Sequence, residues 1–169
     1  MKLTIGIPNA NDIRLLYELN QQNIPELGSL DDADQLKSLI EIAFLTIILK
    51  HKNQIIGFCL LFREGSSYNS PNYIYYNTKY DKFIYVDRVV VSSDFTNNGG
   101  GKLIYNQVFK IAVEENLTVC CEVNEKPLNE ISLAFHKKLG FYKTHEKEYP
   151  KKKVAFLEKP PLSNSQINE

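Results

Sequence analysis

The residues from Phe83 to Lys102, FIYVDRVVVSSDFTNNGGGK, carry more information about the fold than any other stretch of the chain. They begin with an apolar run that is typical of a buried strand, and they end in three consecutive glycines that open an amphipathic helix. Glycine adopts left-handed backbone easily and, because it has no Cβ, lets a ligand approach the backbone closely. The first N–H groups of a helix have no partner within it, and the helix dipole adds positive potential there. The pattern therefore predicts a phosphate site, with a flexible turn as the alternative.

The helix after the glycines leads into a further strand. Its apolar residues recur at helical spacing and should form a buried stripe of Ile104, Val108, Ile111 and Ala112. TVCCEV, at residues 118–123, is then typical of a strand. A crossover through a helix joins parallel strands, whereas hairpins join antiparallel ones. We therefore expect an α/β sheet of mixed direction with one crossover at the glycines.

The residues before this unit predict a strand, two helices and a hairpin. A strand over Lys2–Ile7 should end at Pro8, and Asn9 or Asn11 should cap the first helix. Asp31 should cap the second helix. Two strand-like runs then form an antiparallel hairpin, AFLTIILKH at residues 43–51 and QIIGFCLLFRE at 54–64.

The connection from Glu64 to Asp81 is a candidate substrate loop, because connections longer than about 12 residues are often functional. Its aromatic faces would favour a cation, although tyrosines also simply pack loops onto a sheet. The loop holds half of the ten tyrosines, namely Tyr68, Tyr73, Tyr75, Tyr76 and Tyr80.

The last third of the chain predicts one more helix and two strands. Pro127 should start the helix and Gly140 should end it. Its predicted core residues are Leu128, Ile131, Phe135 and Leu139. Strands at 141–149 and 153–159 then complete one domain over residues 1–159, and residues 160–169 form a polar tail.

Whole-chain composition excludes several classes of function. The 169 residues suit one domain, and the formal net charge of zero gives no global field that would attract nucleic acid. The basic cluster Lys151–Lys153 is read as a solvated turn. No apolar run approaches the roughly 18 residues of a membrane span, and no signal peptide precedes the first strand. We expect a cytoplasmic protein that binds neither nucleic acid nor membrane.

The cysteines and histidines do not suggest a metal site. Cys59, Cys120 and Cys121 are an odd set within predicted strands, which favours reduced, buried thiols. The three histidines, His51, His136 and His145, have no metal-ligand spacing.

A second group of polar residues lies on the helix after Pro127. Asn129, Ser132 and His136 are spaced i, i+3 and i+7, so they share one face beside the apolar stripe. A solvated face is the simpler interpretation. The ending FHKKLGF favours a functional one, because Gly140 turns the chain directly back into the sheet.

Together the two segments resemble the GNAT N-acetyltransferases, which bind acetyl-CoA. That family's central motif has the form Q/R-x-x-G-x-G/A after a strand, and Thr96, Gly99 and Gly101 occupy its positions. The next motif has the form N-x-x-A-x-x-x-Y-x-K-L-G-F. Its positions are occupied here by Asn129, Ser132, His136, Lys138, Leu139, Gly140 and Phe141.

The resemblance implies an α/β (α+β) fold whose central sheet is mixed and mostly antiparallel, with about six or seven strands and about four flanking helices. It also implies direct transfer of acetyl from acetyl-CoA to a primary amine of a small molecule or a polypeptide N-terminus, without a metal and with a homodimer possible. The cofactor-binding residues it implies are Val89, Val90, Val91, Thr96, Asn97, Asn98, Gly99, Gly100, Gly101, Lys102, Leu103, Asn129, Ser132 and Phe135.

The resemblance also suggests catalytic groups. Asp87, two residues before Val89, is the first choice for the base that takes a proton from the amine, with Glu122 or water as alternatives. His136 stands where the family places a tyrosine that protonates the departing thiolate, and an imidazole can serve the same purpose. A structural role for His136, with water or a loop tyrosine as the acid, is the alternative.

Two departures from the family pattern concern the phosphate loop. Thr96 replaces the usual Gln or Arg, and Asn97 and Asn98 replace a frequent Arg. Phosphate binding would then depend on backbone amides and Lys102, so we expect weaker cofactor affinity. The departures, with the missing tyrosine, motivate a second hypothesis: a non-catalytic acyl-CoA sensor.

Overall fold

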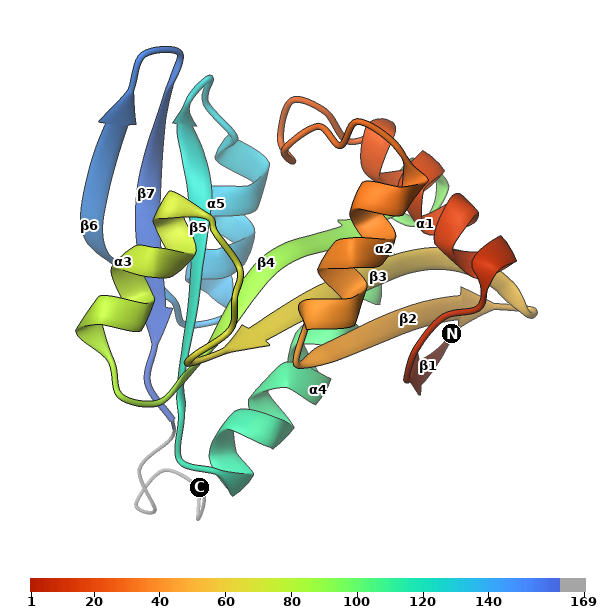
Figure 1. The fold of residues 1–169 in the computed structure, drawn as a ribbon, viewed down its shortest axis with the longest axis horizontal. Helices are drawn as coiled ribbons and strands as arrows, with labels where there is room; N and C mark the ends of the chain where they lie inside the picture. The colour runs from red at the N-terminus through yellow and green to blue at the C-terminus, as the bar shows by residue number, and fades with distance from the viewer. Residues whose placement is uncertain (162–169) are drawn as a thin grey trace.

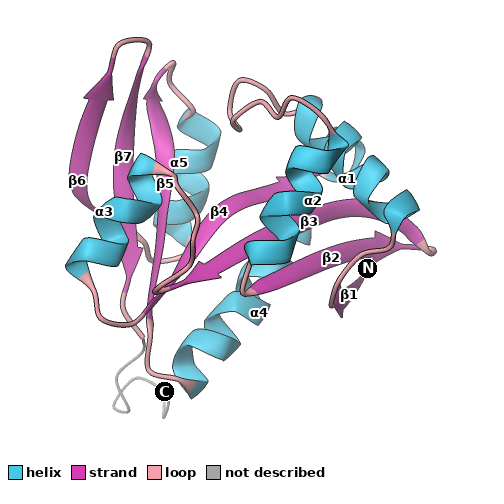
Figure 2. Cartoon of the chain, in the orientation of Figure 1, coloured by secondary structure: helices cyan, strands magenta, loops and turns pink. Residues whose placement is uncertain are grey.

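The computed structural model describes residues 1–161, which form a seven-stranded mixed sheet with helices on both faces (Figure 1). The strand order is β1-β2-β3-β4-β5-β7-β6, and only the β4–β5 pair is parallel within these residues. The strands are β1 (Lys2–Ile5), β2 (Leu45–His51), β3 (Gln54–Arg63), β4 (Phe83–Val91), β5 (Thr118–Lys126), β6 (Tyr142–Tyr149) and β7 (Lys152–Lys159). The helices are α1 (Ala10–Gln21), α2 (Ala33–Ile42), α3 (Pro71–Lys79), α4 (Gly100–Glu114) and α5 (Glu130–Lys138) (Figure 2).

Two apolar clusters, one on each face of the sheet, hold the helices in place. On one face α1, α2 and α3 bury side chains such as Leu16, Leu36 and Tyr73. On the other face α4 and α5 pack onto the sheet, with Val108 at the centre of α4. The interior strand β3 contacts both layers, and its residues 55–62 are all buried. This explains why its sequence is a continuous apolar run rather than an alternating one.

The parallel strands β4 and β5 pair over only a short distance. Their register covers Phe83 to Tyr85 on β4 and Thr118 to Cys120 on β5, after which the two strands diverge (Figure 1). Beyond that point β4 remains paired with β3, and β5 remains paired with β7. The sheet therefore has a V-shaped opening in its middle, and its closed end lies at Tyr85 and Cys120.

Strand β4 bends at the start of this opening. Leu60 of β3 pairs with Arg88, whereas Leu61 pairs with Val86, so Asp87 is an extra residue on β4. Such a β-bulge bends its strand and re-aims the adjacent side chains. The bulge therefore places Asp87 at the closed end of the V-shaped opening.

The predicted fold class is confirmed, with one additional helix. The segment from Glu64 to Asp81, expected as a loop, contains α3. Its composition is poor for a helix, but Pro71 occupies the first turn and Tyr73 and Tyr76 are buried against the sheet. Tertiary packing therefore forms this helix, which local propensity does not predict.

Several predicted element ends need correction. Asp32, not Asp31, caps α2 by accepting a hydrogen bond from the Gln35 N–H. Helix α5 begins at Glu130, later than the predicted Pro127. The predicted core residues Leu128 and Ile131 are instead 67% and 80% exposed, because they lie before and within the first turn of α5. Of the predicted tail, residues 162–169 lie outside the described residues.

Candidate active site

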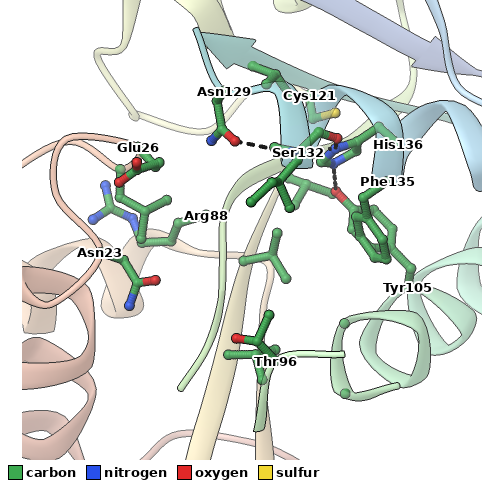
Figure 3. A pocket seen from close by; sticks show the side chains of 18 of the residues that line it. Asn23, Glu26, Arg88, Thr96, Tyr105, Cys121, Asn129, Ser132, Phe135 and His136 are labelled. Atoms are coloured by element: carbon green, nitrogen blue, oxygen red, sulfur yellow. Dashed lines mark hydrogen bonds between the residues drawn. The ribbon is translucent and has the colours of Figure 1, made fainter. Parts of the chain in front are cut away.

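A pocket of about 590 Å³ occupies the V-shaped opening. Residues of β4, β5, the α4 N-terminus, α5 and the α1–α2 loop line it, and Figure 3 shows side chains converging on it from these elements. The pocket brings together both groups of residues that the sequence singled out. The predicted site residues that line it are Asp87, Val89, Val91, Thr96, Asn97, Gly99, Gly100, Gly101, Lys102, Asn129, Ser132, Phe135 and His136. Val90, Asn98 and Leu103 are not among the lining residues.

The three glycines at the start of α4 serve different purposes. Gly99 is the N-cap and has a left-handed φ of +81°, which disfavours any other residue. Gly100 allows close packing, because a Cβ there would lie 2.9 Å from Leu49 Cδ2. Gly101 faces α5, where a Cβ would lie 3.1 Å from Phe135 Cζ.

The same turn leaves backbone amides for a ligand. Leu103 N–H donates to the Gly99 carbonyl at 2.9 Å. The amides of residues 100–102 precede this bond, so their partners must come from outside the helix. Together with the helix dipole they are suited to an anion.

The open edge of β4 also presents backbone groups to the pocket. Ser92 N–H donates to the Ile56 carbonyl of β3 at 2.7 Å. Successive residues of a strand direct their N–H and C=O groups to alternate sides, and the β3–β4 register is regular from Val89 to Val91. The amides of Val89 and Val91 therefore point away from β3 into the V-shaped opening. An extended ligand could bind them as a neighbouring strand would.

His136 is buried and held at both ring nitrogens. Its Nδ1 lies 2.8 Å from the Ser132 carbonyl oxygen, and its Nε2 lies 2.6 Å from the Tyr105 hydroxyl. A carbonyl oxygen only accepts, so Nδ1 carries the proton. Desolvation lowers the pKa of His136, partly offset by the hydrogen bond to Ser132. The ring is therefore neutral near neutral pH, and Nε2 accepts a hydrogen bond from Tyr105.

Glu122 on β5 is an acid with an altered pKa. Tyr85 hydroxyl donates to its Oε2 at 2.7 Å, and Asn72 Nδ2 donates to its Oε1 at 2.8 Å. Desolvation raises the pKa of the Glu122 carboxyl to about 7, although both hydrogen bonds act in the opposite direction. A carboxyl group that changes protonation near neutral pH is suited to general base catalysis.

Asp87 forms an ion pair with its neighbour Arg88. Its Oδ2 accepts from Arg88 Nε at 2.7 Å, and its Oδ1 accepts from the Tyr68 hydroxyl at 2.5 Å. The side chains of Asp87 and Arg88 are 5% and 7% exposed. Arg88 also donates through Nη1 to Asn20 Oδ1 at 2.8 Å, which links β4 to α1. Asp87 therefore balances a buried guanidinium within the pocket wall.

The Tyr105–His136 pair and the Glu122 carboxyl with its partner Tyr85 lie on opposite faces of the sheet. Tyr105 and Cys121 belong to the cluster beneath α4 and α5. Tyr85, the partner of Glu122, belongs to the cluster beneath α1, α2 and α3. The V-shaped opening is where the two faces meet, so one ligand can enter from each face.

The sequence missed some of the residues that line the pocket. Tyr105 was not named from the sequence. It lies three residues before Val108, so its helical spacing is that of a core residue, and nothing in the sequence marks its hydroxyl. Asn23 and Glu26 come from the α1–α2 loop, which Asn124 of β5 contacts through the Pro25 carbonyl at 3.4 Å. A contact of this kind leaves no local sequence signal.

Residues 1–161 show neither a membrane-spanning helix nor a metal-binding cluster. No helix there is both long and apolar enough to cross a bilayer. Nor do these residues contain a group of three or more His, Cys, Asp or Glu side chains that could hold a metal ion.

Comparison with known proteins places this geometry in a family. A family model described as "Acetyltransferase (GNAT) family" matches residues 13–141. The chain belongs to the GNAT acetyltransferase family. The matched span includes the V-shaped opening, the glycines and all of the lining residues. No curated protein matches the chain.

Solved structures of GNAT proteins share the fold. The ribosomal-protein-S18-alanine N-acetyltransferase of Escherichia coli aligns over 96% of each chain, with a TM-score of 0.71 and 14% identity. An aminoglycoside 6'-N-acetyltransferase complexed with coenzyme A aligns over 97% of this chain and 99% of its own, with a TM-score of 0.74 and 14% identity. NAA60 of Arabidopsis thaliana, in complex with a bisubstrate analogue, aligns over 94% and 98%, with a TM-score of 0.71 and 14% identity. At these identities the similarity establishes the fold of this GNAT chain.

Proposed function

We propose that this GNAT protein transfers acetyl from acetyl-CoA directly to a primary amine of a small molecule or a polypeptide N-terminus. The observation that carries the proposal is the pocket itself, which connects an anion-binding helix start on one face of the sheet to Glu122 on the other. A thioester donor and an amine acceptor can therefore meet at the closed end of the V-shaped opening without sharing an entrance.

The residues present fit acetyl-CoA. The amides of residues 100–102 suit the pyrophosphate, and the inward-pointing amides of Val89 and Val91 suit the pantetheine arm. Lys102 adds one positive charge beside the glycines, where Thr96 and Asn97 add none. When bound, acetyl-CoA supplies an activated thioester carbonyl and a thiolate leaving group.

Glu122 is the group we assign as general base, with Asp87 in a supporting role. An amine must lose a proton before it can attack a carbonyl, and Glu122 changes protonation near pH 7. Asp87, our first choice from the sequence, has both carboxylate oxygens occupied by Arg88 and Tyr68. It would hold Arg88 in place and leave proton removal to Glu122.

Neutral partners surround the Glu122 carboxyl, which favours a cationic acceptor. Tyr85 and Asn72 donate hydrogen bonds to it without adding charge, whereas Asp87 already neutralises Arg88. An approaching ammonium group would therefore find an acidic end of the pocket and could pass its proton to Glu122.

Two measurements test the proposal in sequence. Acetyl-CoA should raise the thermal midpoint of the protein, whereas ATP and NAD should not. Thiol release from acetyl-CoA should then depend on an added amine and should rise with pH through about 7. Tight acetyl-CoA binding with no amine-dependent thiol release over a broad panel would reject the enzyme and leave the acyl-CoA sensor.

A further inference from the structure

The buried pair of Tyr105 and His136 suggests how the pocket treats the sulfur of the departing thiolate. On the face of the sheet covered by α4 and α5, the deep end of the pocket is walled by Val86, Tyr105, Cys121 and His136. Val86 and Cys121 are the first residues after the β4–β5 pairing ends. A pantetheine arm that followed Val89 toward the closed end of the opening would bring its sulfur to this wall.

The hydrogen-bonding pattern prevents the neutral form of His136 from donating toward that sulfur. Its single proton is on Nδ1 and is directed at the Ser132 carbonyl oxygen, 2.8 Å away. Nε2 has a lone pair directed at the Tyr105 hydroxyl, 2.6 Å away. The only proton between these two side chains therefore belongs to Tyr105.

We propose, given the acetyl transfer proposed above, that the Tyr105 hydroxyl is the hydrogen-bond donor to the departing thiolate sulfur and that His136 is the positioning residue that holds it. Tyr105 is the one tyrosine among the described lining residues. Tyr105 lies on α4, the helix after the glycines. This helix would therefore supply the hydrogen-bond donor in a chain whose α5 carries His136 in place of the family's tyrosine.

The Tyr105 hydroxyl would donate a hydrogen bond to the thiolate and would keep its proton. Burial raises the pKa of Tyr105 well above its usual value, so its proton stays on oxygen. Once the amine nitrogen has bonded to the thioester carbonyl carbon, the C–S bond would break and its electron pair would move to sulfur. The O–H would then turn from His136 Nε2 toward the new negative charge. The amine proton passes to Glu122, and the thiolate takes a proton from solvent after release.

Single and double variants test this division of roles. Tyr105→Phe should lower kcat on the order of tenfold to a hundredfold, somewhat less than the loss of an oxyanion donor, with an unchanged KM for acetyl-CoA. His136→Phe should lower kcat to a smaller extent, and His136→Gln should restore part of it, because its Oε1 can accept from Tyr105. The double variant Tyr105→Phe/His136→Phe should be no slower than Tyr105→Phe alone, since the histidine acts only through the tyrosine.

Controls separate this role from a loss of stability. Tyr73, like Tyr105, is 1% exposed, and its hydroxyl donates to the Arg63 carbonyl at 2.7 Å outside the pocket lining, so Tyr73→Phe is the matched control. It should keep the parent kcat, and the thermal midpoint of each variant reports folding.

Several outcomes would overturn the proposal. If folded Tyr105→Phe keeps the parent kcat, Tyr105 is not the donor to the thiolate. If the double variant is much slower than Tyr105→Phe, His136 itself acts as the acid. A ¹⁵N NMR spectrum of the free protein should show the His136 proton on Nδ1, and a proton on Nε2 would contradict the geometry whatever the activity. If the parent chain releases no thiol with any amine, the proposed acetyl transfer is wrong and the role of Tyr105 is wrong with it. If the parent is active, the kcat of Tyr105→Phe tests the role of Tyr105 alone.

Discussion

Replacing Glu122 by Gln should stabilise the protein at alkaline pH while it lowers activity. The Glu122 carboxyl has a pKa of about 7 in the fold against 4.5 for the free side chain. At 1.36 kcal/mol per pH unit, this difference corresponds to about 3 kcal/mol. Because the folded pKa is raised, the folded state holds a proton that the unfolded chain has lost between pH 4.5 and 7. The parent protein therefore loses stability as pH rises through this window.

Glutamine resembles the protonated carboxyl and does not titrate. Its Oε1 can accept from Asn72 and its Nε2 can donate to the Tyr85 oxygen, so both contacts survive. The free energy of unfolding of Glu122→Gln should thus exceed that of the parent by a margin that grows by about 3 kcal/mol from pH 5 to pH 8.

Urea unfolding at several pH values measures this margin directly. Glu26 lines the same pocket from an exposed loop, so Glu26→Gln is the matched control. It should change the free energy of unfolding by less than about 0.5 kcal/mol. In parallel, kcat of Glu122→Gln should fall by about 10² or more if the residue is the base. Parallel pH curves for the parent and Glu122→Gln would show that the pKa of Glu122 is not raised in the fold.

Three further substitutions address other parts of the site. Asp87→Ala leaves the buried Arg88 guanidinium without its carboxylate and should lower the free energy of unfolding in urea by about 3 kcal/mol. The control Lys126→Ala, whose partner Glu148 is exposed, should lower it by under about 1 kcal/mol. Equal losses would contradict the buried pair. Gly101→Val pushes against Phe135 and the anion-binding turn, so calorimetry should show acetyl-CoA affinity reduced by about tenfold or more, while Gly28→Val, in open space, should bind as the parent does. Gly140→Ala forces a side chain onto a φ of +87° and should lower stability by about 1–2 kcal/mol, and an unchanged thermal midpoint would show that the turn relaxes.

The predictions that succeeded rest on local signals. The apolar runs of β3 and β4, the Asn9 cap of α1 and the left-handed Gly140 after α5 each depend on neighbours within a few residues. The pairing of the glycine turn with the polar face of α5 also succeeded, because both segments follow strands that border the same V-shaped opening.

The predictions that failed depend on tertiary contacts. Helix α3 forms because Tyr73 and Tyr76 are buried on the sheet, and its composition conceals this. Ile131 has the spacing of a core residue, yet it faces the pocket rim because α5 starts later than Pro127. The choice between Asp87 and Glu122 as general base stays a prediction. The sequence alone could not show that Asp87 pairs with Arg88 beside a β-bulge.

A joint count of both products is the direct test of the proposed acetyl transfer. The purified protein is incubated with acetyl-CoA and an amine panel that includes peptides with free N-termini, and released thiol and N-acetylated amine are quantified by mass spectrometry. We expect equal amounts of the two products and a rate that collapses in Gly101→Val. Thiol release without acetylated amine, or no release despite saturating acetyl-CoA, would contradict it.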